Sequence, residues 1–338
     1  VFLGSSVIAQ KNHAEEADAA YENHSYYDAI SLYKSAFTKV KSAKDKKEVL
    51  YRIGRSYFNL QDYDNAKSWL SKAIKTGYSG NEAQYYYAET LRRMGLYDEA
   101  IVEFKKYKEL APSDKNVDKY ISECQDAQEW LDNPTRYIVE KDPVLNSKQS
   151  DFSPAWADKR HTSLMFTSTK EGSVGDNVDP ITGQNYSSIW YTKQDKKSKK
   201  WMIPTILDDG VINNGTANEG SGTFDSKFKS VYFTRCMTKK KTDLGCGIYV
   251  SKKVGSTWSE TELIKLSKSD TSVSGHPSIG MKDTYLFFAS DMPGGQGGKD
   301  IWYSKYDKKD KSWGPAVNCG ADVNTDGNEM FPYIHEDG

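Results

Sequence analysis

The chain has 338 residues, with 46 Lys and Arg against 47 Asp and Glu, for a formal net charge of −1. Each half is also close to neutral, which excludes the basic surplus typical of proteins that bind nucleic acids or anionic membranes. Apolar residues make up 37%, and none of their runs reaches the roughly 18 residues of a transmembrane helix. The length suggests about two domains.

The first ten residues are apolar or small and carry no charge. Val7 and Ala9 precede Gln10 with the spacing of a signal-peptidase site, so we expect residues 1–10 to be the remnant of a secretory signal peptide. A buried first strand is the alternative. No Cys follows this run as a lipoprotein acylation site, and we expect the chain to be a fragment of a longer protein at both ends.

Residues 11–133 contain almost no Pro or Gly, and their apolar residues recur at helical spacing. Three Tyr-x-x-Ala motifs end at Ala29, Ala66 and Ala100, which are 37 and 34 residues apart. Twelve positions before the Ala of each motif stands a small residue: Ala17, Gly54 and Ala88. Four and seven positions after that Ala stand two residues that also correspond between the motifs: Tyr33/Ala36, Leu70/Ala73 and Phe104/Tyr107. The small residues let two helices cross closely, so the period predicts stacked helix pairs.

This period and pattern resemble the tetratricopeptide repeat (TPR). The resemblance implies an all-α TPR solenoid of three repeats in residues 11–133, with a longer loop over 42–47 and a polar capping helix over 114–131. TPR arrays have a concave binding groove. The repeat phase places in it six residues, which include Tyr and Arg, the usual anchors of protein interfaces: Tyr51, Arg55, Asn59, Tyr85, Glu89 and Arg92. The alternative is that these residues only pack against neighbouring helices or face solvent.

From Pro134 onward the pattern changes to strands of period two, separated by Gly, Asn, Asp and Lys. Two sets of three segments align with one another, each set predicting one strand that recurs three times. The first set is residues 164–168, 231–235 and 286–290, and the second is residues 189–193, 248–252 and 301–305. Trp201, Trp258 and Trp313 follow them at intervals of 57 and 55 residues. Four short strands in each unit of about 55 residues predict the blades of a β-propeller.

Three motifs in this region resemble the WD40-like repeat of TolB-type propellers: Ser-Pro-x-Trp at 153–156, Gly-Gly-Lys-Asp-Ile-Trp-Tyr-Ser at 297–304, and Trp-Gly-Pro-Ala-Val-Asn-Cys-Gly at 313–320. The resemblance implies that residues 134–338 form a partial all-β propeller. About three blades are present, followed by the first strand of another. Because a propeller needs at least about four blades to close, we expect an incomplete ring in this chain.

Two motifs suggest ligand sites but depart from the required pattern. The Gly-rich run from Pro293 to Asp300 lacks the first Gly and the final Ser or Thr of a phosphate-binding P-loop, so we interpret it as a turn between strands. Asp322–Gly327 matches the start of an EF-hand loop, but Tyr333 stands where a bidentate Glu is needed. A structural turn is the interpretation here, with a loose Ca²⁺ loop as the alternative.

The cysteines and histidines suggest no zinc site and no catalytic set. The four cysteines form no C-x-x-C motif, and the histidines are scattered, with His161, His276 and His335 at expected strand edges or turns. Cys236 and Cys246 flank a predicted hairpin and are candidates for a disulfide, which an exported protein allows. The alternative for them is two unpaired thiols. We therefore expect no enzyme activity, no metal and no cofactor.

The order of signal peptide, TPR array and WD40-like propeller is similar to that of a family of Bacteroidota envelope proteins, which includes the PorE-like proteins of the type IX secretion system. In that family a small β-sandwich and an OmpA-like peptidoglycan-binding domain follow. The resemblance implies a non-enzymatic scaffold in the periplasm, associated with the outer membrane. It would bind other envelope proteins, and it would reach peptidoglycan only through a domain outside this chain.

Two alternatives remain open from the sequence. TolB-type propellers also cap the catalytic domain of prolyl-oligopeptidase-like serine hydrolases, in which case the catalytic domain would lie outside this chain. The other alternative is a TolB-like periplasmic adaptor.

Overall fold

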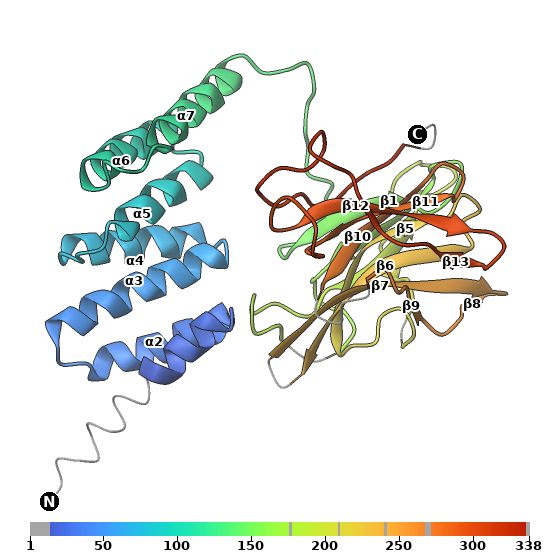
Figure 1. The fold of residues 1–338 in the computed structure, drawn as a ribbon, viewed down its shortest axis with the longest axis horizontal. Helices are drawn as coiled ribbons and strands as arrows, with labels where there is room; N and C mark the ends of the chain where they lie inside the picture. The colour runs from blue at the N-terminus through green and yellow to red at the C-terminus, as the bar shows by residue number, and fades with distance from the viewer. Residues whose placement is uncertain (1–13, 176–177, 209, 240–241, 268–271, 336–338) are drawn as a thin grey trace, which may run out of the picture. The chain divides into compact units, whose positions relative to one another are not determined.

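The computed structural model describes residues 14–175, 178–208, 210–239, 242–267 and 272–335 (Figure 1). The chain forms two compact units that divide chiefly between Glu140 and Lys141. The expected signal-peptide remnant, residues 1–10, lies outside the described residues.

The first unit is a stack of seven helices within the described residues. Residues 14–22 are helical, and six further helices follow: α2 (Tyr26–Lys39), α3 (Ala43–Asn59), α4 (Tyr63–Lys75), α5 (Glu82–Arg93), α6 (Tyr97–Leu110) and α7 (Val117–Asp132). Each helix packs against the next in order, as Figure 1 shows. The seven helices fit a TPR solenoid in which α7 covers the last pair.

The small residues of the repeat lie where the helices cross. Ala17, Gly54 and Ala88 are buried, and three apolar clusters follow one another along the stack. At the second crossing a Cβ added to Gly54 would lie 2.8 Å from the Leu70 Cγ and 2.9 Å from the Leu70 backbone nitrogen. The closest helix crossing therefore depends on the absence of a side chain at Gly54.

Gly54→Ala is expected to lower the free energy of unfolding by about 1–3 kcal/mol because the added methyl group overpacks against α4. Helix propensity alone predicts the opposite sign, a gain of about 1 kcal/mol. Chemical denaturation followed by circular dichroism measures the difference, with Lys44→Ala on the exposed side of α3 as the control. A stabilised Gly54→Ala protein would show that packing at this crossing is looser than the structure describes.

The longer loop predicted over residues 42–47 is wrong. Helix α3 begins at Ala43, with Ser42 as its N-cap: the Asp45 backbone N–H donates to the Ser42 Oγ at 3.3 Å. The Lys-rich start of α3 looks like a loop because it is polar all round. The cap and the buried face formed by Val49, Ile53 and Gly54 nevertheless fix it as a helix.

The second unit contains three antiparallel sheets, each made from consecutive strands. Their strands are β1 (Asp151–Trp156), β2 (Ser163–Ser168), β3 (Ser188–Lys193) and β4 (Thr205–Ile206); β5 (Ala217–Phe224), β6 (Ser230–Lys239), β7 (Thr242–Val254), β8 (Thr257–Trp258) and β9 (Glu262–Leu263); and β10 (Ser274–Gly280), β11 (Tyr285–Ser290), β12 (Asp300–Asp307), β13 (Ser312–Trp313) and β14 (Val317–Asn318). The aligned sequence rows correspond to β2, β6 and β11, and then to β3, β7 and β12. The Gly-rich run that begins at Pro293 joins β11 to β12, as expected of a turn.

The first strand of each sheet contains the same irregularity. Ser153 in β1, Ser221 in β5 and His276 in β10 have φ values of 50°, 48° and 55°, and the pairing register shifts at each of them. Each bulge is held by the preceding sheet where a Thr is available: the Ser221 N–H donates to Thr167 Oγ1, and the His276 N–H donates to Thr234 Oγ1. Phe331, with φ of 56°, repeats this conformation at the next Pro motif.

A buried Asn fixes the chain after the last strand of the first sheet and again after the last strand of the third sheet. The Ile189 N–H donates to Asn213 Oδ1 at 2.7 Å, and Asn213 Nδ2 donates back to the Ile189 carbonyl at 3.1 Å. Asn324 makes the same pair of bonds with Ile301, at 2.7 and 3.0 Å. The amide of Asn324, within the EF-hand-like run, is thus used in a structural turn.

Candidate functional site

The six residues predicted to face a partner lie on two helices of the stack. Tyr51, Arg55 and Asn59 belong to α3, and Tyr85, Glu89 and Arg92 belong to α5. In the structure two of them serve internal packing, two belong to an internal ion-pair network, and two remain partly exposed beside each other.

Both predicted tyrosines pack within the repeats. Tyr51 is buried and stacks on Tyr78, with ring centroids 4.7 Å apart. Tyr85 is half-buried, and its ring contacts those of Tyr86, Phe104, Tyr107 and Tyr120. Burial raises the pKa of both hydroxyl groups. These two side chains therefore stabilise the stack more than they extend a free surface.

Glu89 and Arg92 form ion pairs with neighbouring helix residues. Glu89, only 3% exposed, accepts from Arg92 Nη2 at 2.9 Å and from Arg93 Nε at 2.9 Å. Arg92 also pairs with Glu123 of α7. Burial lowers the pKa of Arg92, but its bonds to Glu89 and Glu123 outweigh burial and raise it. The charge of Arg92 is thus compensated within the stack.

Arg55 lies in a different environment, which we call the Arg55 platform and define as Arg55, Phe58, Asn59 and Tyr86. The guanidinium carbon of Arg55 lies 3.6 Å from the Tyr86 ring centroid and 5.1 Å from that of Phe58, and its Nη1 donates to Asn59 Oδ1. All four residues are partly exposed. Sequence reasoning missed Phe58 and Tyr86, although the run Tyr85–Tyr87 marks a helix with aromatic side chains on several faces.

The second unit contains a cavity of about 820 Å³. It is lined by β1, β5 and β10 from the bulge to the end of each strand, by the turns that follow them, and by the segment Phe331–Ile334. Trp156 and Phe331 are 43% and 51% exposed, and each stacks on a histidine: Trp156 on His161 at 4.9 Å, and Phe331 on His276 at 3.9 Å. The irregular conformation repeated in the sheets thus gathers aromatic rings around one hollow.

His276 is neutral at the wall of this cavity. Burial and the charge of Lys299 lower its pKa to about 4, and its Nδ1 has no hydrogen-bond partner among the described residues. The structure gives it neither a carboxylate nor a nucleophile as a hydrogen-bond partner within those residues, so His276 has the surroundings of a packed ring. Ser153 and Ser221 hydrogen-bond to each other, with their Oγ atoms 3.1 Å apart.

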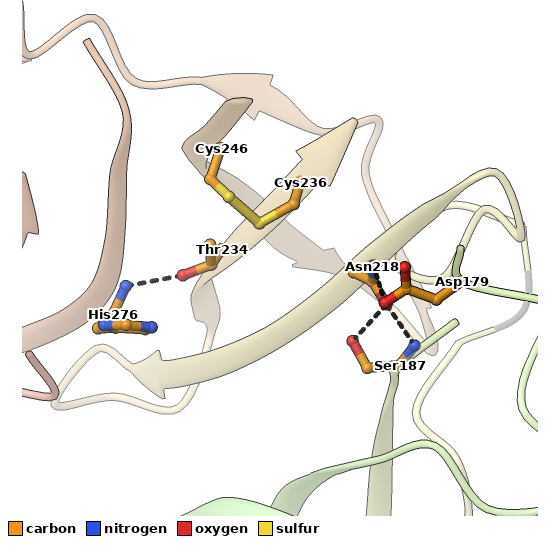
Figure 2. The surroundings of a disulfide bond; sticks show 7 residues. All are labelled: Asp179, Ser187, Asn218, Thr234, Cys236, Cys246 and His276. Carbon is orange, nitrogen blue, oxygen red and sulfur yellow. Dashed lines mark hydrogen bonds between the residues drawn. A yellow bond between two sulfur atoms is a disulfide. The ribbon is translucent and has the colours of Figure 1, made fainter. Parts of the chain in front are cut away.

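Cys236 and Cys246 form a disulfide bond across the hairpin of β6 and β7 (Figure 2). The two cysteines are direct cross-strand partners. Cys236 lies two residues after Thr234, which accepts the hydrogen bond from the His276 N–H. The other two cysteines, Cys124 and Cys319, are free. The bond therefore closes the hairpin of the second sheet beside the contact between that sheet and β10.

The described part of the chain holds no group of three or more His, Cys, Asp and Glu side chains arranged to bind a metal. None of its helices combines the length and apolar character needed to span a bilayer.

A tetratricopeptide repeat family model matches residues 14–77 and again residues 51–115. The prediction of TPR repeats is thereby confirmed for this part of the chain. No curated protein matches the chain.

Three solved structures illustrate the similarity of the helical part. Caenorhabditis elegans UNC-45 in complex with a Hsp90 peptide is 18% identical over 37% of this chain and 14% of its own, with a TM-score of 0.33. MamA from Desulfovibrio magneticus RS-1 is 22% identical over 36% of this chain and 68% of its own, with a TM-score of 0.33. The Arabidopsis OM64 TPR domain is 16% identical over 36% of this chain and 98% of its own, also with a TM-score of 0.33. The chain thus spans a small part of the length of UNC-45.

Proposed function

We propose that this protein is a non-enzymatic scaffold that binds partner proteins through its TPR repeats. The observation that carries the proposal is the helical stack of residues 14–115, which matches the TPR model and packs through the small residues of that repeat. Solenoids of this kind use extended surfaces to bind peptides and proteins. The Arg55 platform supplies such a surface with an arginine and two aromatic rings, the residue types that dominate binding energy at interfaces.

We further propose that the three sheets are consecutive blades of an incomplete WD40-like propeller. The repeated bulge, the positive φ at Ser153, Ser221 and His276, and the matching bonds of Asn213 to Ile189 and of Asn324 to Ile301 support a single structural repeat. A second protein-binding face on this unit follows from the proposal. Propellers present flat ends for protein partners, and the cavity opens among the first strands.

The place we propose for this scaffold is the periplasm, in association with the outer membrane. The Cys236–Cys246 disulfide supports an oxidising compartment, since disulfides persist outside the cytosol. The combination of TPR repeats with WD40-like sheets supports a component or anchor of an envelope machine such as the type IX secretion system. Binding to peptidoglycan would need an OmpA-like domain beyond these residues.

Affinity capture tests the scaffold proposal. The full chain is immobilised and incubated with the envelope fraction of its source cells, and retained proteins are quantified by mass spectrometry with and without excess soluble chain. We expect a small set of envelope proteins that soluble chain displaces. Retention of no protein above the blank matrix, or turnover of peptide substrates by the purified chain, would contradict the proposal.

A further inference from the structure

The arginines of α3 and α5 differ in how their charges are compensated. Arg52 pairs with Glu48 at 3.0 Å and with Glu22 at 3.5 Å. Arg92 and Arg93 share Glu89, and Arg92 also pairs with Glu123. Across the described ranges of the chain, Arg55 has no carboxylate partner at all. Among the described arginines of these two helices, Arg55 is therefore the one without an acid.

Arg55 is nevertheless held in place. Its planar group lies over the Tyr86 ring, and Nη1 donates to Asn59, so the side chain has lost much of the rotamer freedom that a ligand would otherwise have to remove. A guanidinium has five N–H donors, and the bond to Asn59 is the one that Arg55 makes within the described residues. Nε and Nη2 thus remain for an acceptor from outside the chain.

The surroundings of Arg55 are aromatic. Phe58 and Tyr86 flank the guanidinium, and Tyr21 of the first helix lies close enough that Arg55 opposes the rise in the Tyr21 pKa caused by burial. Partial burial among rings lowers the local dielectric and strengthens a charge-assisted bond. The acceptor that matches such a fixed, planar cation is a carboxylate, which can take two parallel N–H···O bonds.

We propose that the Arg55 platform binds an acidic side chain, Asp or Glu, within an extended segment of a partner protein. The carboxylate accepts from the free donors of Arg55, and the neighbouring residues of the segment pack against Phe58 and Tyr86. This inference rests on the proposed function and adds the chemistry of the partner. It also separates Arg55 from Arg92, whose charge is already compensated by Glu89 and Glu123.

The test uses an array of nonapeptides with randomised flanks and a fixed centre of Glu, Asp, Gln or Asn. The peptides are acetylated and amidated, so a centre of Glu or Asp supplies a carboxylate at the fixed position. The full chain is expected to bind the Glu and Asp arrays about tenfold more tightly than their amide counterparts, a preference that falls at high salt. Arg55→Ala should abolish the preference, and Arg55→Lys should weaken it because an ammonium cannot form the planar pair.

Arg93→Ala is the matched control, since it removes a cation from α5 that already pairs with Glu89. It should leave the acid preference unchanged. Equal binding of acid and amide peptides by the wild-type chain, or an acid preference that survives in folded Arg55→Ala, would overturn the inference. So would binding that is absent from these amidated peptides and appears only in a second array with free C-terminal carboxylates. If envelope proteins are still captured equally by wild type and Arg55→Ala, the scaffold proposal stands and only this assignment fails.

Discussion

Arg235→Met is expected to lower the free energy of unfolding by about 3–5 kcal/mol, because it leaves a buried carboxylate without its cation. Arg235 Nε and Glu219 Oε1 are 3.0 Å apart, and their side chains are 7% and 1% exposed. Arg235 also donates to Thr261 and to the carbonyls of Val211 and Ile212, so its removal leaves several acceptors unpaired. Denaturant titration above pH 7, where Glu219 of the folded wild type is ionised, measures the loss.

The pH dependence separates the charge effect from lost packing. Burial raises the pKa of Glu219 from its ordinary 4.5 to about 7, and Arg235 opposes this rise. The folded state therefore holds the extra proton, and ionisation of Glu219 lowers the free energy of unfolding as pH rises from about 4.5 to about 7. Without Arg235 the pKa of Glu219 rises further. The loss in free energy of unfolding caused by Arg235→Met, its deficit, should therefore grow above pH 7.

Two variants complete this experiment. Glu219→Gln combined with Arg235→Met removes the unpaired charge and should recover part of the stability at high pH. Lys108→Met breaks the exposed pair with Asp118 and should change stability by less than about 0.5 kcal/mol. A deficit for Arg235→Met that does not vary with pH would show that packing, and not the charge of Glu219, accounts for it.

Asn213→Ala should lower the free energy of unfolding by about 1–3 kcal/mol. Asn213 is fully buried; its amide accepts from the Ile189 N–H and donates to the carbonyls of Ile189 and Asp208, of which the Ile189 carbonyl also accepts from the Leu207 N–H. Each buried backbone group left without a partner costs about 1–3 kcal/mol. Asn213→Asp keeps the acceptor and loses the donor, so its deficit should be of similar size and should shrink in acid, where the carboxyl can donate.

Asn214→Ala is the neighbouring control. Its side chain is partly exposed and accepts from the nearby Thr216, so we expect a change within about 1 kcal/mol. Asn324→Ala should reproduce the effect of Asn213→Ala, because Asn324 makes the same bonds to Ile301. A large effect at Asn213 with none at Asn324 would contradict the equivalence of the two junctions.

The repeats could be predicted from the sequence because they depend on spacing. Gly54 and Leu70 meet at a helix crossing, as the twelve- and four-residue intervals from Ala66 require. The aligned strand rows likewise follow from period two. The prediction of a loop over 42–47 is wrong because the polar composition of this segment conceals a helix that Ser42 caps.

The candidate surface could be predicted only in part, since the repeat phase gives a face and no partners. It placed Arg55 and Arg92 together, yet Arg92 is neutralised by Glu123, which is 31 residues away on a helix outside the repeats. The cavity was missed for a different reason: the positive φ values of Ser153, Ser221 and His276 occur at residues that do not require them. At Ser221 and His276 the conformation is held by bonds to Thr167 and Thr234 of the preceding sheet, contacts that local sequence does not encode.

Site-specific photo-crosslinking tests whether α3 and α5 carry a protein-binding surface. A benzoylphenylalanine is introduced at Tyr86 in the full chain, and separately at Val102, which is 51% exposed on α6. After irradiation in the source cells, we expect discrete adducts with envelope proteins at Tyr86 and none of them at Val102. Adducts at neither position, or the same adducts at both, would contradict a protein-binding surface on α3 and α5.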